Sequence, residues 1–146
     1  MRKMLVPAFV MLTAFGPCCA QTASLSVVRL DCRAPLSPMF SPPATQQERE
    51  QISTEWVGAD ELAVESWDEE TAESRVDPGT AKMHLDGSTV TLSYSYRSVA
   101  ADRSKSTPAC KSLIKLFFTV SELPRSRYQL RIQDGHGRIR QFTIDG

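Results

Sequence analysis

The sequence predicts an all-β protein that folds as an antiparallel sandwich of about six or seven strands. Short segments of alternating apolar and polar residues, turn signals between them and a scarcity of helical periodicity favour this class. Hydrophobic residues make up 41% of the 146 positions and charged residues 23%, which indicates one folded domain rather than a disordered tail or a membrane protein.

The first 20 residues have the anatomy of a secretory signal peptide. Arg2 and Lys3 precede an apolar run over residues 4–15, and small residues lead to Ala20. The run is too short to span a bilayer as a helix. We therefore expect an exported protein, periplasmic or extracellular, whose mature part is a single domain over residues 21–146.

Cys18 and Cys19 raise the alternative of a lipid anchor. A lipidation signal places Leu or a similar aliphatic residue three positions before the modified cysteine, whereas Phe15 and Gly16 occupy those positions here. The poor match favours a soluble mature protein without a membrane span.

The beginning of the mature chain predicts a strand, a crossing segment and a short helix. Residues 23–32 are rich in Val and Leu and predict the first strand, and four prolines within residues 33–44 predict an extended crossing. Thr45 and Glu48 have the spacing of a capping box, which favours a short helix near residues 46–56.

The middle of the chain predicts β structure. Residues 61–67 alternate as a strand, and residues 82–85 and 89–96 flank Asp86-Gly87, a pair typical of a tight hairpin turn. Alternation in the second hairpin strand places four residues on its inward face: Val90, Leu92, Tyr94 and Tyr96.

Three further strands are predicted after residue 110. Residues 112–120 are apolar on both faces except at Lys115, which indicates a central strand. Residues 127–133 alternate, and residues 138–144 form the last strand. In that last strand Ile139 and Phe142 fall on opposite faces, which predicts a bulge.

Leu123-Pro124, followed by Tyr128 and the alternating residues 129–132, resembles the tyrosine corner of immunoglobulin-like and fibronectin type III sandwiches. The five-residue Leu-to-Tyr spacing is similar to that of small exported bacterial domains. The resemblance covers about ten residues and implies an immunoglobulin-like sandwich. It also implies that the tyrosine ring fills the end of the core while its hydroxyl caps backbone at the corner. It implies nothing about a ligand, since such folds host many functions.

Two cysteines, Cys32 and Cys110, follow the signal peptide, and an even number in an exported protein predicts a disulfide. The closed loop would span 110 − 32 = 78 residues, for which loop closure contributes on the order of 4 kcal/mol. The alternatives are two free thiols or a metal site, but the wide spacing lacks a zinc-ligand pattern.

Charge is segregated along the chain although its formal sum is zero. Residues 48–77 contain eleven acidic and two basic side chains, and residues 97–146 contain ten basic and four acidic ones. We interpret these runs as solvated faces and loops, with a bipolar surface that steers a charged partner as the alternative. The overall balance argues against nucleic acid as a partner.

Four arginines near the C-terminus are the candidate binding surface. Outward side chains on neighbouring strands would form a ladder that holds an anion, a cell-wall polymer or an acidic protein surface: Arg127, Arg131, Arg138 and Arg140. The alternative is that they keep exposed strands soluble. The acidic run Asp68–Glu70 lacks the spacing and glycine of a calcium loop, so we expect no metal.

The sequence offers no catalytic motif, so we expect neither catalytic residues nor a cofactor. His84 and His136 lie beside turns, where we expect surface residues. We therefore predict a non-catalytic binding module that recognises another envelope or extracellular protein. The alternatives are a structural component of an envelope or secretion assembly, completed by strand exchange, and an inhibitor of a cell-wall hydrolase.

Overall fold

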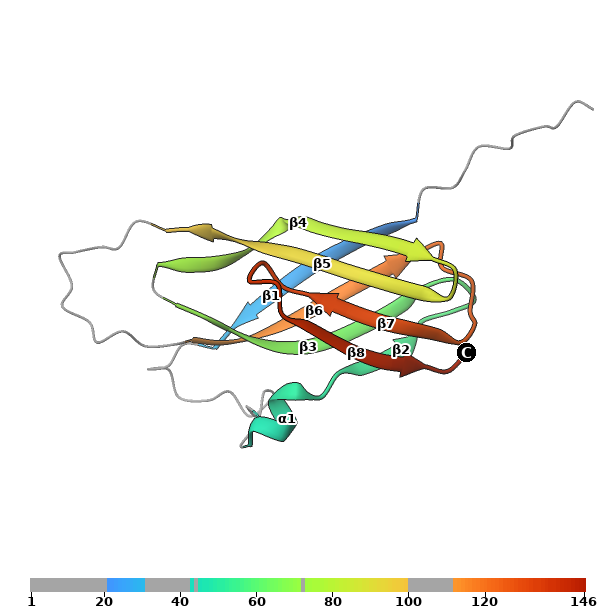
Figure 1. The fold of residues 1–146 in the computed structure, drawn as a ribbon, viewed down its shortest axis with the longest axis horizontal. Coiled ribbons are helices and arrows are strands. Elements are labelled where there is room, and N and C mark those ends of the chain that lie inside the picture. The colour runs from blue at the N-terminus through green and yellow to red at the C-terminus, as the bar shows by residue number, and fades with distance from the viewer. Residues whose placement is uncertain (1–20, 31–42, 44, 72, 100–111) are drawn as a thin grey trace, which may run out of the picture.

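The computed structural model shows a β-sandwich of two four-stranded sheets, one behind the other in Figure 1. The described residues are 21–30, 43, 45–71, 73–99 and 112–146. The elements are β1 (Thr22–Arg29), α1 (Gln46–Glu50), β2 (Ser53–Trp56), β3 (Leu62–Glu70), β4 (Ser74–Asp86), β5 (Thr89–Ser98), β6 (Ser112–Ser121), β7 (Tyr128–Gln133) and β8 (Ile139–Ile144). The predicted all-β sandwich is confirmed, with eight strands rather than six or seven.

Several predictions fall outside the described residues. They are the signal peptide over residues 1–20, the cysteines Cys18, Cys19, Cys32 and Cys110, and almost all of the proline-rich stretch at 33–44.

The eighth strand arises because the predicted helix is shorter than expected. Thr45 caps α1 as predicted: its Oγ1 accepts from the backbone N–H of Glu48 at 3.2 Å, and its own N–H donates to the Glu48 carboxylate. The helix ends at Glu50, because residues 53–56 instead pair with β3 from Leu62 to Glu65 as β2. Pairing with β3 therefore determines the conformation of residues 53–56, because the helical pattern there is weak.

Sheet I contains β1-β6-β3-β2 and is antiparallel throughout, and sheet II contains β4-β5-β7-β8. The central position predicted for residues 112–120 is confirmed, because β6 lies between β1 and β3 (Figure 1). In sheet II, β5 and β7 are parallel, and the other pairs are antiparallel. This strand order differs from the order in immunoglobulin constant domains, where the first strand pairs with the second.

The hairpin of β4 and β5 is confirmed and is longer than predicted. Gly87 has a φ of 57°, the left-handed conformation that such a turn requires. Pairing extends to Ser74 and Ser98, with a register shift between Asp77 and Lys82.

The core fills the space between the sheets with the inward residues of alternate positions. It consists of Leu25, Leu62, Val64, Val76, Val90, Leu92, Tyr94, Ile114, Leu116, Phe118, Val120, Leu123, Tyr128, Leu130, Ile132 and Ile144. At one corner the Tyr128 hydroxyl donates to the carbonyl of Pro124 at 2.7 Å, beside the fully buried Leu123. This is the contact that the tyrosine-corner resemblance implies.

The bulge predicted in the last strand is absent. β8 pairs with β7 in an unbroken register, with Gln133 opposite Ile139 and Tyr128 opposite Ile144. Ile139 is simply exposed, at 44% of its surface, while Phe142 packs against the core. The inward position between them is occupied by Arg140.

Candidate functional site

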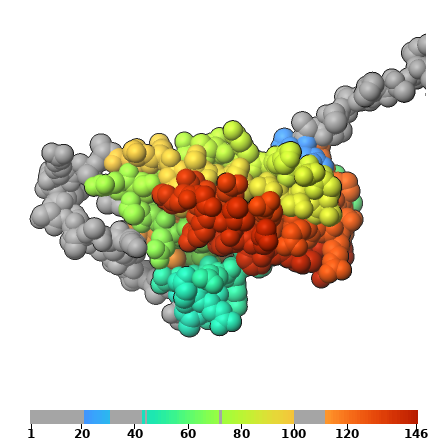
Figure 2. Space-filling model, in the orientation of Figure 1, coloured from blue at the N-terminus to red at the C-terminus, as the bar shows by residue number. Residues whose placement is uncertain are grey.

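One margin of the sandwich is left open by the shortness of β2. Because β2 pairs only with the first four residues of β3, no strand among the described residues pairs with Ser66–Glu70 on that side. The Trp67 carbonyl there accepts from Nη1 of Arg140 on β8 at 3.0 Å. α1 lies beside the same edge, where Nη1 of Arg49 is 2.9 Å from Glu69 Oε1. Figure 2 shows the segment that contains α1 projecting next to the C-terminal strands.

The inward face of β3 changes from apolar to polar along this margin. Leu62 and Val64 are followed at the same face by Ser66, Asp68 and Glu70, all buried. The expectation that the acidic run is solvated is therefore wrong for Asp68 and Glu70, whose side chains are 3% and 2% exposed. The alternation that buries the apolar residues also places these two carboxylates inside. Buried carboxylates require partners.

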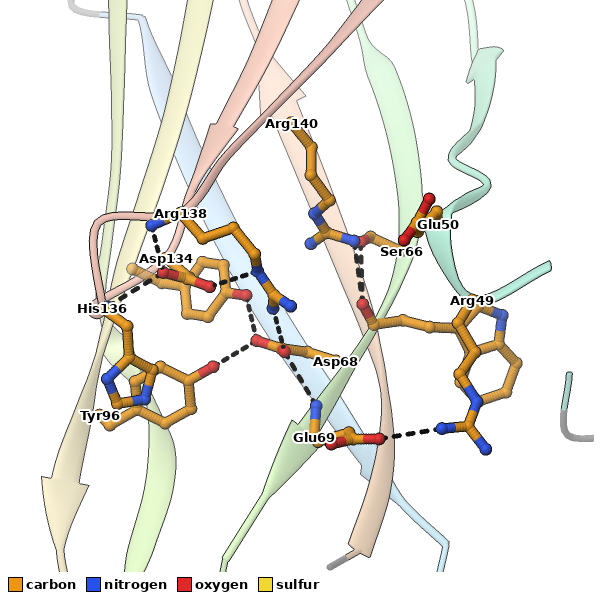
Figure 3. Close-up of polar contacts among 12 residues, drawn as sticks. Arg49, Glu50, Ser66, Asp68, Glu69, Tyr96, Asp134, His136, Arg138 and Arg140 are labelled. Carbon is orange, nitrogen blue, oxygen red and sulfur yellow. Dashed lines mark hydrogen bonds and ion pairs between the residues drawn. The ribbon is translucent and has the colours of Figure 1, made fainter. Parts of the chain in front are cut away.

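Asp68 has partners at both of its oxygens. The hydroxyls of Tyr94 and Tyr96 donate to Oδ2 (Figure 3). Oδ1 accepts from Nη2 of Arg138 at 2.7 Å and from the backbone N–H of Glu69 at 2.9 Å. β3 of sheet I is thereby tied to β5 and to the start of β8 in sheet II.

The environment of Asp68 favours its charged form. Burial is the largest single influence and would by itself raise its pKa, but the hydrogen bonds from Tyr94 and Tyr96 act in the opposite direction. Together with the Glu69 N–H and the charge of Arg138, they hold the pKa of Asp68 below its ordinary value of 3.8.

The two tyrosines and the arginine respond in the complementary direction. Burial, followed by the charge and the hydrogen bond of Asp68, raises the pKa of Tyr94 far above the ordinary value, and the same causes raise the pKa of Tyr96. Burial would lower the pKa of Arg138, but its ion pairs with Asp68 and Asp134 raise it. All three side chains therefore stay protonated donors across the physiological range.

Asp134 organises the turn between β7 and β8. Its Oδ1 accepts the backbone N–H groups of His136 and Arg138, and its Oδ2 lies 2.9 Å from Nε of Arg138. The imidazole of His136 lies against the ring of Tyr96, with centroids 4.4 Å apart (Figure 3). A separate pair joins Arg29 to Glu70 at 2.9 Å, and Glu70 also accepts the N–H of Val76 at 2.8 Å.

Two hollows flank Arg138. The first, of about 110 Å³, lies between α1, β3 and β8 and is lined by Gln46, Arg49, Glu50, Trp67, Asp68, Glu69, Leu113, Arg138 and Arg140. The second, of about 280 Å³, is lined by Asp68, Glu69, Thr71, Tyr96, Asp134, His136 and Arg138. The margin thus combines arginine donors with aromatic walls.

The outer face of sheet I carries a partly exposed aromatic group. Trp67 and Lys115 are paired across β3 and β6, and Glu65 is paired with Phe117. Nζ of Lys115 lies 5.6 Å from the ring of Trp67, 5.0 Å from the ring of Phe117 and 2.6 Å from the Glu65 carboxylate. A third hollow of about 330 Å³ adjoins this group, beside residues 51–53.

The structure divides the four predicted site arginines among three places. Arg127 is exposed, 3.5 Å from Asp145. Arg131 faces outward on β7, and its Nε is buried without an acceptor among the described residues. Arg138 reaches Asp68, whereas Arg140 shares the inward face, opposite Ile132. The structure therefore brings Arg138 and Arg140 together at the open margin and leaves the other two on the outside.

The predicted surface histidines are exposed, His84 on β4 and His136 in its turn. Sequence reasoning missed Arg49, Trp67 and the network partners of Asp68. Part of the signal was available, because both tyrosines occupy inward positions of a predicted strand, whereas Asp68 lies one residue beyond the strand predicted over residues 61–67. The rest required knowledge of which strands face each other.

Within the described part of the chain, no group of three or more His, Cys, Asp or Glu side chains is arranged to hold a metal ion. No helix in that part is long and apolar enough to cross a bilayer. The sequence matches no protein family, and no match was found among curated proteins or solved structures.

Proposed function

We propose that this protein is an exported, non-catalytic binding module that recognises another protein through the outer face of sheet I. The observation that carries the proposal is the group formed by Trp67, Lys115 and Phe117, hereafter the aromatic patch. Aromatic side chains are enriched at protein interfaces, and Trp is among the residues that dominate their binding energy. Alternation along a strand would normally place polar residues at such outward positions.

The hydrogen bonds and ion pairs around Asp68 support a structural role for these buried side chains. Both oxygens of Asp68 accept hydrogen bonds, and Arg138 bridges two carboxylates. Such mutual engagement is typical of an ion-pair network that fixes two sheets together, and structural networks also perturb pKa values. This favours binding over catalysis.

Export and the disulfide remain part of the proposal. β1 and β6 run side by side, and the N–H of Leu30 donates to the carbonyl of Leu113 at 3.0 Å. Cys32 follows Leu30 by two residues, and Cys110 precedes Leu113 by three. This proximity in sequence to a paired point supports a Cys32–Cys110 bond.

The test compares capture of partners by the full exported chain and by patch variants. Trp67→Ala and Phe117→Ser should each weaken capture of an extracellular or envelope protein by about tenfold or more. Ile139→Ser, which changes another partly exposed apolar residue, should leave capture unchanged. Circular dichroism and thermal unfolding would confirm that each variant is folded.

Equal capture by Trp67→Ala, Phe117→Ser and the unmodified chain would contradict the patch as the binding surface. If the purified chain captures nothing and self-associates in size-exclusion chromatography, the assembly component is the better assignment. A specific complex with a cell-wall hydrolase that abolishes its turnover would identify the inhibitor alternative.

A further inference from the structure

The first hollow, between α1, β3 and β8, is lined by two arginines that each have one buried nitrogen without a hydrogen-bond acceptor among the described residues. Nε of Arg49 and Nη2 of Arg140 are buried and have no hydrogen-bond partner within the described part of the chain. Both arginines line this hollow of about 110 Å³. Each guanidinium has a partner at another nitrogen, but buried N–H groups in native proteins are nearly always paired as well. A ligand with hydrogen-bond acceptors, bound in the hollow, would supply the partner that each of these two nitrogens lacks.

The acceptors that line the hollow are already engaged. Asp68 receives hydrogen bonds at both oxygens. Glu69 is paired with Arg49 at 2.9 Å, and Glu50 accepts from Gln46 Nε2 at 3.0 Å. The carbonyl of Trp67 accepts from the other terminal nitrogen of Arg140 (Figure 3). Two arginine nitrogens thus stay without an acceptor from the described residues, although three guanidinium groups and three carboxylates line the hollow.

The size and chemistry of the hollow point to one class of ligand. A water molecule occupies about 30 Å³ of liquid, so the space suits a group of a few heavy atoms. Guanidinium N–H groups bind carboxylate and phosphate oxygens better than neutral acceptors, because the hydrogen bonds are charge-assisted. We propose that this hollow binds an oxyanion, a carboxylate or a phosphate, between Arg49 and Arg140. Trp67 lines this hollow and also belongs to the aromatic patch. Oxyanion binding is nevertheless a different function from recognition of a protein through the patch, and it needs no protein partner.

The experiment titrates the full chain with sodium phosphate and, separately, with sodium acetate, while sodium chloride keeps the ionic strength constant. Isothermal titration calorimetry should detect saturable binding of one equivalent of at least one of the two oxyanions. The phosphate and acetate arms identify which oxyanion the site prefers. Arg140→Gln should weaken binding by about tenfold or more, because it removes a charge-assisted donor.

Arg49→Gln is the second variant and should weaken binding similarly, so the test does not depend on the folding of the Arg140 variant. Arg127→Gln is the matched control, because it removes an exposed arginine that does not line the hollow. Its affinity should stay within about twofold of the unmodified chain. Absence of saturable binding in both arms would overturn the proposal. Unchanged binding in both arginine variants, or equal weakening by Arg127→Gln, would overturn it as well.

Discussion

The guanidinium of Arg138 lies 2.7 Å from the carboxylate of Asp68, although 70 residues separate them in the sequence. The contact joins the inward face of β3 to the turn before β8, and hence sheet I to sheet II. The side chain of Asp68 is 3% exposed and that of Arg138 is 57% exposed, so only the carboxylate of this ion pair is buried. Asp68 is the member that cannot be left unpaired or be replaced without cost.

Asp68→Asn should lower the free energy of unfolding by about 2–4 kcal/mol, below the upper range for fully buried pairs because Arg138 is half-exposed. The amide removes the charge that two tyrosine hydroxyls and the guanidinium share. Urea denaturation at neutral pH measures the loss. Glu55→Gln, at an exposed position of β2, is the control and should change stability by less than about 0.5 kcal/mol. Equal stability of Asp68→Asn and the unmodified protein would show that the network does not stabilise the fold.

Acid should destabilise the folded protein partly through Asp68. Its pKa is lowered on folding, so its contribution is present above the ordinary value of 3.8 and is lost as the pH falls through the lower folded pKa. Urea midpoints measured at successive pH values should decline in this acidic range. The decline should be shallower in Asp68→Asn, and parallel curves for the two proteins would contradict the lowered pKa.

Alkaline pH should destabilise the fold through Tyr94 and Tyr96. Their pKa values are raised on folding, so their contribution is complete below the ordinary value of 10.0 and is lost progressively as the pH rises above it. In a Tyr128→Phe background, only these two tyrosines remain among the three in the chain. Tyrosinate absorbance should then appear together with the loss of β-structure by circular dichroism. Ionisation near pH 10 in the folded state would contradict the raised pKa values.

Reduction of the protein should lower its free energy of unfolding by about 4 kcal/mol if Cys32 and Cys110 are bonded, since the reduced unfolded chain gains loop entropy. Alkylation under non-reducing conditions followed by mass spectrometry counts the free thiols. The double variant Cys32→Ser/Cys110→Ser should be insensitive to reductant. Two alkylated cysteines in the unreduced protein would exclude the bond.

Local signals were sufficient to predict much of the fold. Asp86-Gly87 specifies its hairpin through the backbone alone, and the apolar run that contains Leu116 indicates a central strand, which lies between β1 and β3. The contact of Tyr128 with Pro124 spans four residues. In each case the determining interactions are near in sequence or follow from simple alternation.

The open margin could not be predicted in the same way. Trp56 belongs to a strand rather than a helix because β3 is available as a partner, and Arg140 points inward because its position in the register faces Ile132. The side-chain partners of Asp68 come from β5 and from the turn before β8, and no local pattern indicates that these segments face β3. The candidate site therefore depends on the arrangement of the two sheets.

The pairing of β1 with β6 also has a consequence for the order of folding. Thr22 pairs with Ser121, so the first strand of the described chain finds its place only after nearly all the later strands exist. Contacts between residues so far apart in sequence form slowly, because the entropy of closing a long loop must be overcome first. A nascent chain therefore cannot complete sheet I until β6 has been synthesised. That delay would suit a polypeptide that has to pass through a narrow translocation pore before it folds.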